Sequence, residues 1–191
     1  MTNLFKKTFV LALLLACGLS AGLAQAKPLD AGTFYIEPKV GFYGNSNDRI
    51  YSMFTYGAEI GYFLVDGLSL GFEGQGYIIT QRRYPNWSWG GSSNNETVNA
   101  FSPIGIARWH FINEEKFSVF AGIGLGGFFS GVKVPRNGYD SNLTEVVEAG
   151  ASVFFNDNMS LLLAARWQHI GEFSSKGADN WGGNLAFKYS F

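Results

Sequence analysis

Cysteine is nearly absent from this sequence of 191 residues, whose one cysteine, Cys17, lies in an apolar leader. Without a second thiol the chain has no internal disulfide and no cysteine set for a zinc site. Charged residues make up only 15% of the chain. After the leader, no apolar stretch is long enough for a helix to cross a bilayer. These absences exclude disulfide-stapled domains, cysteine-based zinc domains and helical membrane proteins.

The leader has the three parts of a secretory signal peptide. Two lysines give a positively charged start, an apolar core follows, and Ala24-Gln25-Ala26 matches a small-residue cleavage site. We therefore expect a signal peptide over 1–26 and a mature domain over 27–191. An alternative stays open, because Leu14-Leu15-Ala16-Cys17 resembles a lipobox, which would leave a lipidated cysteine at the mature N-terminus.

Acidic and basic residues nearly balance, with 15 Asp and Glu against 14 Lys and Arg, and removal of the leader takes lysines away. A mature chain with net negative charge argues against nucleic acid as a partner. Aromatic residues make up 17% of the chain, which also has 25 glycines. Aromatic and glycine-rich segments with little charge are typical of a lipid-facing β-barrel. The sequence shows no motif for a cofactor or a metal ion, so we expect neither.

The last seven residues alternate between apolar and polar side chains and end on Phe191. Such alternation predicts a strand with one apolar and one polar face. Turn signals divide the mature chain into eight segments of this kind, at about 32–43, 50–64, 68–82, 96–112, 117–135, 143–155, 159–173 and 182–191. We therefore expect an all-β fold, an eight-stranded antiparallel transmembrane β-barrel, which is too narrow for an open pore.

The connections between these strands alternate in length. Three are short, at 65–67, 113–116 and 156–158, and four are longer, at 44–49, 83–95, 136–142 and 174–181. Short turns at one end and longer loops at the other are typical of outer-membrane barrels with both termini in the periplasm. The final strand, which ends on Phe191, resembles the closing strand of that class. The sequence thus predicts a location in the outer membrane of a Gram-negative cell.

When the residues of each expected strand are assigned to its two faces, four acids and four bases lie on the polar faces: Glu37, Glu59, Glu73, Glu148, Lys39, Arg108, Arg166 and Lys188. An unpaired Arg or Lys that faces lipid at mid-depth costs about 2–4 kcal/mol. We therefore expect these charges to point into the barrel, where each needs a partner of opposite sign. The sequence predicts a plugged, charge-paired lumen.

Three other patterns have structural explanations. Gly122–Gly127 matches G-x-G-x-x-G, but that motif binds dinucleotides at a strand-to-helix turn, and here it lies inside an expected strand. His110 is interpreted as a hydrogen-bonding residue of the lumen. The loop Arg82–Trp89 carries arginines and tryptophans that suit either an anchor at the lipid headgroups or contact with sugars and lipopolysaccharide phosphates.

His169 is the single candidate catalytic residue. By the parity of its strand it faces lipid near the extracellular end. The segment Arg166–Gly171, followed by Asn180–Asn184 and the terminal strand, resembles the lipid A deacylase family. Those eight-stranded barrels carry R-x-x-H-x-S-N on the penultimate strand and then N-P-G-x-N. The resemblance covers about 101–191, and it implies removal of an ester-linked acyl chain from lipid A with His169 as the base.

The nucleophile of that family has no counterpart at the matching position. Gly171 stands where the family has serine, Glu172 where it has asparagine, and Trp181 where it has proline. A glycine has no hydroxyl with which to form an acyl-enzyme. Of the serines that follow, only Ser175 would share the outward face of His169, and only on a strand that continued that far. The deacylase motif is therefore degenerate, and the sequence favours a protein without enzymatic activity.

Three function classes remain. The favoured one is a non-enzymatic outer-membrane barrel resembling the OmpA/OmpX type, with a structural role or a surface interaction made by its loops. The alternatives are a lipid A-modifying esterase, active or degenerate, and a small-solute channel, which the paired lumen charges disfavour. The expected partners are outer-membrane lipid, lipopolysaccharide and, during biogenesis, the barrel assembly machinery. The protein is expected to be a monomer.

Overall fold

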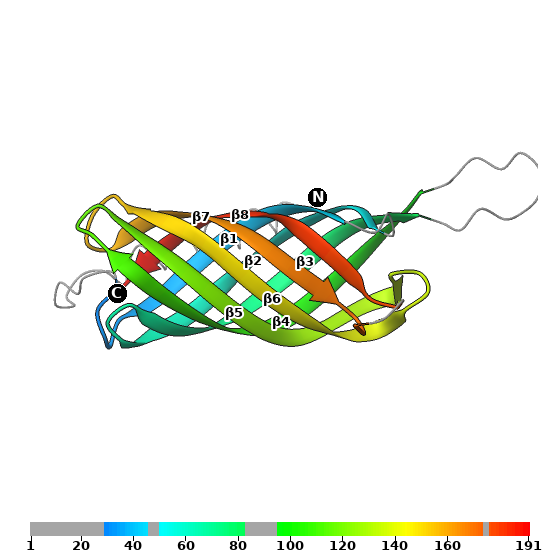
Figure 1. Ribbon diagram of the computed structural model, residues 1–191, viewed down its shortest axis with the longest axis horizontal. Coiled ribbons are helices and arrows are strands. Elements are labelled where there is room, and N and C mark those ends of the chain that lie inside the picture. Colours follow the sequence, from blue (N-terminus) through cyan, green and yellow to red (C-terminus); the bar gives the residue numbers. More distant parts are fainter. Residues whose placement is uncertain (1–28, 46–49, 83–94, 174–175) are drawn as a thin grey trace, which may run out of the picture.

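The protein is a closed antiparallel barrel in the computed structural model, which describes residues 29–45, 50–82, 95–173 and 176–191 (Figure 1). In chain order the strands are β1 (Phe34–Asn45), β2 (Ile50–Val65), β3 (Leu68–Arg82), β4 (Asn95–Asn113), β5 (Phe117–Val134), β6 (Tyr139–Phe154), β7 (Met159–Ile170) and β8 (Ala178–Ser190). The predicted all-β, eight-stranded fold is confirmed. The predicted signal peptide, 1–26, lies outside the described residues.

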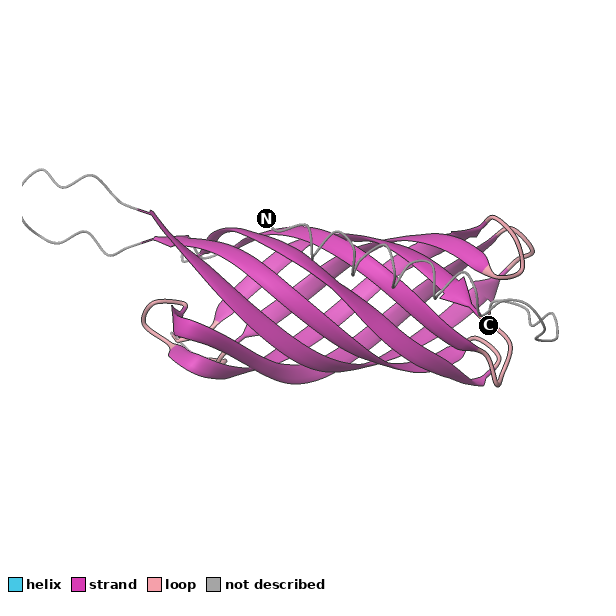
Figure 2. Ribbon diagram, turned by 180° about the vertical axis from the view of Figure 1, so that it is seen from behind, coloured by secondary structure: helices cyan, strands magenta, loops and turns pink. Residues whose placement is uncertain are grey.

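Each strand pairs with the next along the chain, and β8 returns to β1 to close the sheet (Figure 2). The closing pair runs from Tyr35 opposite Ser190 to Asn45 opposite Asn180. Closure lets the backbone groups of every strand find partners within the sheet, which a protein segment in lipid requires. Among the described residues, none forms a helix of the length and hydropathy needed to cross a membrane.

The two faces of each strand differ as the alternation predicts. Along β1, Phe34 and Phe42 are exposed on the outer wall, whereas Glu37 and Lys39 are buried inside. An apolar outer wall around a polar interior is the inverse of a water-soluble protein and suits a bilayer. Towards the short turns the outer wall carries a ring of aromatic side chains: Tyr62, Phe111, Phe117, Phe155 and Phe191.

The predicted loop over 136–142 is wrong. β5 runs to Val134 and β6 begins at Tyr139, so the connection spans only 135–138. The Asn142 side-chain amide donates to the backbone oxygens of Val134 and Tyr139, at 3.1 and 2.8 Å, and holds this hairpin together. Polar residues in a strand that continues past the apolar band look like loop residues in the sequence, which explains the error.

Apolar clusters line the lumen towards both ends, a feature that the strand alternation alone does not predict. The loop-end seal lies at the end with the longer connections and comprises Tyr43, Ile50, Met53, Tyr77, Ile79, Val98, Phe128, Val134, Ile170 and Ala178. The turn-end seal lies near the short turns and comprises Leu29, Tyr35 and Phe63. The side chains of both seals are buried, and they place apolar groups between the polar middle of the lumen and each end of the barrel.

Candidate functional site

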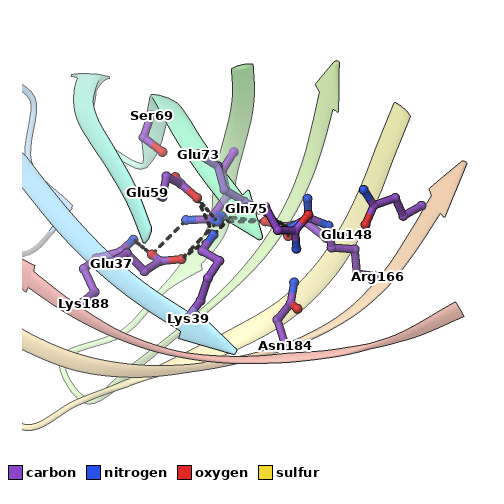
Figure 3. Close-up of polar contacts among 12 residues, drawn as sticks. Glu37, Lys39, Glu59, Ser69, Glu73, Gln75, Glu148, Arg166, Asn184 and Lys188 are labelled. Carbon is purple, nitrogen blue, oxygen red and sulfur yellow. Dashed lines mark hydrogen bonds and ion pairs between the residues drawn. The ribbon is translucent and has the colours of Figure 1, made fainter. Parts of the chain in front are cut away.

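Between the two seals lies the lumen network, which comprises the charged side chains Glu37, Lys39, Glu59, Glu73, Arg108, Glu148, Arg166 and Lys188 (Figure 3). Every strand except β5 contributes at least one of them. All of them are buried, so the prediction that these charges point into the barrel is confirmed. The sequence places them correctly because parity along a strand decides which side chains share a face.

Lys39 occupies the centre of the network. Its ammonium nitrogen lies 2.6 Å from a Glu59 oxygen, 2.9 Å from Glu73 and 3.2 Å from Glu37. An ammonium group has three N–H donors and no acceptor. The ammonium donates hydrogen bonds to Glu59 and Glu73, and Glu37 adds a third carboxylate as an ion-pair partner from its own strand, β1.

The Arg108 guanidinium joins three carboxylates in the same way. Its nitrogens lie 3.1 Å from Glu37, 3.0 Å from Glu59 and 2.9 Å from Glu148. The guanidinium carbon also lies 5.0 Å from the centroid of the Phe120 ring, which adds a cation–π contact. Arg108 thus connects acids that stand on β1, β2 and β6.

Arg166 and Lys188 complete the network. Arg166 lies 3.0 Å from Glu73 and 3.7 Å from Glu148. Lys188 lies 3.3 Å from Glu37, and its ammonium sits 4.4 Å from the centroid of the Tyr35 ring. Each of the four carboxylates consequently contacts at least two basic groups, which offsets the cost of taking it out of water.

Little free space is left in the network. A cavity of about 10 Å³ lies among Glu37, Lys39, Arg108 and Glu148, and Asn184 and apolar side chains complete its wall. A volume of this size holds about one water molecule. The packing around this cavity therefore supports a plugged lumen and leaves no room there for a solute to pass.

Two glycines make room for the network. Gly61 and Gly71 are register partners on β2 and β3. A Cβ on Gly71 would lie 2.5 Å from a Glu59 carboxylate oxygen, and one on Gly61 would overlap the Tyr35 phenol, whose hydroxyl donates to Glu59 at 2.6 Å. Neither position could be singled out beforehand, because nothing in the sequence distinguishes these two glycines from the other glycines of the chain.

The candidate catalytic residue, His169, lies on β7 with outward parity, but the prediction that it faces lipid is wrong. Its side chain is only 3% exposed. The ring nitrogen Nδ1 lies 2.8 Å from a carboxylate oxygen of Asp179 on β8. The Phe173 ring stacks parallel to the imidazole, with 4.2 Å between the ring centroids. The chain that follows β7 therefore folds back and covers the histidine.

The turn after His169 explains why Gly171 stands at the position where the lipid A deacylase family has serine. β7 ends at Ile170, whereas the sequence predicts a strand to 173. Gly171 follows with φ at +103°, a conformation in which any residue with a Cβ is strained. Gly171 thus forms the turn and supplies no hydroxyl. Ser175, which would share the face of His169 only on a longer strand, lies outside the described residues.

His110 has the role that the sequence suggests for it. The residue is buried, and its Nδ1 lies 2.9 Å from the Ser118 hydroxyl oxygen. The imidazole packs between the rings of Phe63 and Phe120. In the described part of the chain, no group of three or more His, Cys, Asp or Glu side chains is arranged to hold a metal ion. Gly122–Gly127 lies within β5, as predicted.

Exposed polar contacts connect neighbouring hairpins at the loop end. Arg136 lies 2.8 Å from Glu96. The Lys176 ammonium donates to the Tyr139 hydroxyl at 2.8 Å, and this hydrogen bond raises the pKa of Lys176. The predicted contact loop Arg82–Trp89 lies outside the described residues beyond its first residue.

No protein family model and no curated protein matches the chain. Among solved structures, it is similar to the N-terminal β-barrel domain of Pseudomonas aeruginosa OprF, with a TM-score of 0.57, 19% identity and coverage of 84% of this chain and 98% of that one. It is also similar to Neisserial surface protein A, with a TM-score of 0.61, 17% identity and coverage of 84% and 99%. These comparisons do not support the lipid A deacylase resemblance. They show that the chain has the eight-stranded barrel fold of outer-membrane proteins.

Proposed function

We propose that this protein resides in the outer membrane as a barrel with a closed, charge-paired lumen and serves a structural or surface-interaction role. The observation that carries the proposal is the inside-out distribution of side chains. Large apolar residues such as Phe42 and Leu163 cover the outer wall, and the charged network is buried. In this proposal the outer wall contacts outer-membrane lipid and lipopolysaccharide, and the barrel assembly machinery inserts the chain as a monomer.

The arrangement of the lumen favours this role over that of a channel. A conduit needs a continuous polar path, whereas the loop-end and turn-end seals place apolar side chains above and below the network. The network itself is tightly paired around a cavity that holds about one water. Function in this proposal therefore lies on the surfaces of the barrel and not in its interior.

We expect the purified protein to insert into a planar bilayer without producing steady conductance, because the seals and the network block the lumen. Insertion is checked by co-flotation with vesicles and by faster migration of the unboiled protein on SDS gels. A bacterial porin in the same bilayer serves as the positive control. Regular single-channel steps from the inserted barrel would show that the lumen conducts and would overturn the proposed role.

We also expect lipid A to keep its acyl chains in cells that express the protein, because Gly171 offers no nucleophile beside His169. Mass spectrometry of lipid A from cells with and without the protein measures this directly. His169→Ala is the matched variant. If lipid A loses one acyl chain in cells with the wild-type protein but not in cells with His169→Ala, the proposal is contradicted and the esterase function is supported.

A further inference from the structure

Two shallow apolar grooves on the outer wall of the barrel join into one. The first, with a volume of about 520 Å³, lies over β1, β2 and β3, and the second, of about 450 Å³, lies over β3, β4 and β5. Leu70 and Gly71 on β3 line both of them. We call the combined feature the wall groove. It crosses five strands on the surface that carries the exposed apolar side chains.

The floor of the wall groove is a single row of register partners. From β1 to β5 this row consists of Tyr35, Gly61, Gly71, Ile106 and Gly124. Tyr35 and Ile106 are buried, and a Cβ on Gly61 or Gly71 would meet the lumen side chains Tyr35 and Glu59. Because this row directs its side chains inward, its backbone forms the bottom of the groove.

The walls of the groove are the two neighbouring rows of outward side chains. Most of the positions in these rows carry large apolar residues such as Leu70. The walls are lowest on β4, where Gly105 and Ala107 stand on either side of the floor. On β6 the apolar wall ends, because the register partner of Leu125 is Glu145. The groove therefore has a defined apolar length from β1 to β5.

The wall groove rises from the short turns towards the middle of the barrel. Tyr35 is the second residue of β1, whereas Gly124 is the eighth residue of β5. The strands run obliquely to the long axis of the barrel (Figure 1). Five strands spaced by about 4.8 Å and tilted by about 35–45° give a groove roughly 19 Å long that rises by about 11–14 Å. This rise is close to the roughly 15 Å depth of one hydrocarbon leaflet.

The lower end of the groove has the side chains of a membrane interface. Tyr62 packs there against Phe34, with 4.6 Å between the ring centroids. Amphipathic aromatic rings of this kind suit the level of the lipid headgroups. In the described part of the chain, the turns at this end carry one basic residue, Lys116, and five acidic ones: Asp30, Asp66, Glu114, Glu115 and Asp157. Such an acidic rim attracts an ammonium group and repels an anionic headgroup.

We propose that the wall groove binds one acyl chain of a phospholipid with an amine-bearing headgroup from the periplasmic leaflet. The headgroup lies near Tyr62 and the acidic rim, and the chain follows the floor to its methyl end near Ile123. A lipopolysaccharide of the opposite leaflet would place its phosphates at the loop end, away from the interfacial end of the groove. That lipid surrounds the barrel rests on the proposed function; the groove and the acidic rim do not.

Photocrosslinking in phosphatidylcholine vesicles tests the site. The probe is phosphatidylethanolamine with a diazirine near the methyl end of one acyl chain, and mass spectrometry maps the labelled residues. Ile123 in the groove and Leu163 on β7 outside it are both 65% exposed. We expect at least about threefold more label on Ile123, because a preformed groove holds the chain in place. Equal labelling would overturn the groove but not the membrane location, and an outer wall without label would overturn both.

Two further probes test how the lipid lies in the groove. With the diazirine near the carboxyl end of the chain, the label should move from Ile123 to Phe34 and Tyr62. If it stays on Ile123, the chain enters from the opposite leaflet, and the periplasmic phospholipid is wrong. Phosphatidylglycerol with the original chain should label Ile123 at least about threefold less than phosphatidylethanolamine does. Equal or stronger labelling would overturn the amine-bearing headgroup.

Variants that narrow the groove supply the matched controls. Ala107→Trp is expected to lower the label on Ile123 at least about threefold, because the larger side chain fills the low part of the wall. Ala165→Trp, at an exposed alanine of β7 outside the groove, should leave that label unchanged. Gly105→Leu narrows the groove from the opposite wall, where a Cβ would meet only the Leu125 backbone oxygen, at 3.8 Å. Migration of unboiled samples on SDS gels shows that each variant is folded. If both narrowing variants keep the full label, the acyl chain does not lie in this groove.

Discussion

Replacing Arg108 with methionine is expected to lower the free energy of unfolding by about 3–5 kcal/mol. The guanidinium contacts Glu37, Glu59 and Glu148, and all four side chains are buried. Methionine keeps much of the length of the side chain but removes the charge. Three carboxylates would then share too few basic partners inside the barrel, where water cannot take the place of the lost donor.

Urea unfolding in phospholipid vesicles, followed by tryptophan fluorescence, measures this loss. Arg136→Met is the matched control, because Arg136 makes an exposed ion pair that contributes about 0–1 kcal/mol. A second variant, Arg108→Met with Glu37→Gln, restores the charge balance of the lumen network and should recover part of the stability. If Arg108→Met unfolds at the same urea concentration as Arg136→Met, the network does not stabilise the fold as described.

Replacing Leu163 with arginine is expected to cost about 2–4 kcal/mol in a bilayer. Leu163 is 65% exposed on the outer wall, with Ala151 and Leu185 as its register partners on either side. In a water-soluble protein, a substitution at such an exposed position changes stability by less than about 0.5 kcal/mol. The size of the effect therefore measures whether lipid or water surrounds this part of β7.

Thr97→Arg provides the comparison, because Thr97 is exposed on β4 beyond the apolar band. The same vesicle unfolding assay applied to both variants should show a large loss for Leu163→Arg and a small one for Thr97→Arg. Equal losses, or no loss for either, would argue against a bilayer around the middle of the barrel.

The sequence was sufficient to predict which side chains share the interior of the barrel. Lys188 and Glu37 are far apart in the chain, and parity alone put both inside, where they form an ion pair at 3.3 Å. Parity survives small errors in strand length, because a strand that is two residues longer still alternates in the same phase. This is why the lumen network was predictable although several strand ends were not.

The features that the sequence did not predict depend on contacts that follow no repeating pattern along the chain. Phe173 covers His169 because the chain turns at Gly171 and folds back, and alternation along β7 contains no information about that return. Val134 enters the loop-end seal because its hairpin bends, again outside any repeating pattern. The sequence predicts the outward parity of His169 correctly and its environment incorrectly for this reason.

The distribution of the lumen network over seven strands also bears on how the barrel assembles. Glu37 on β1 takes its partners from β1, β4 and β8, so its full set of contacts exists only after the last strand has joined the first. A sheet that stopped short of closure would hold uncompensated charge in an apolar surrounding, which is strongly unfavourable. The interior charges are therefore all paired only in the closed barrel, so charge pairing favours the complete barrel over a partly closed sheet.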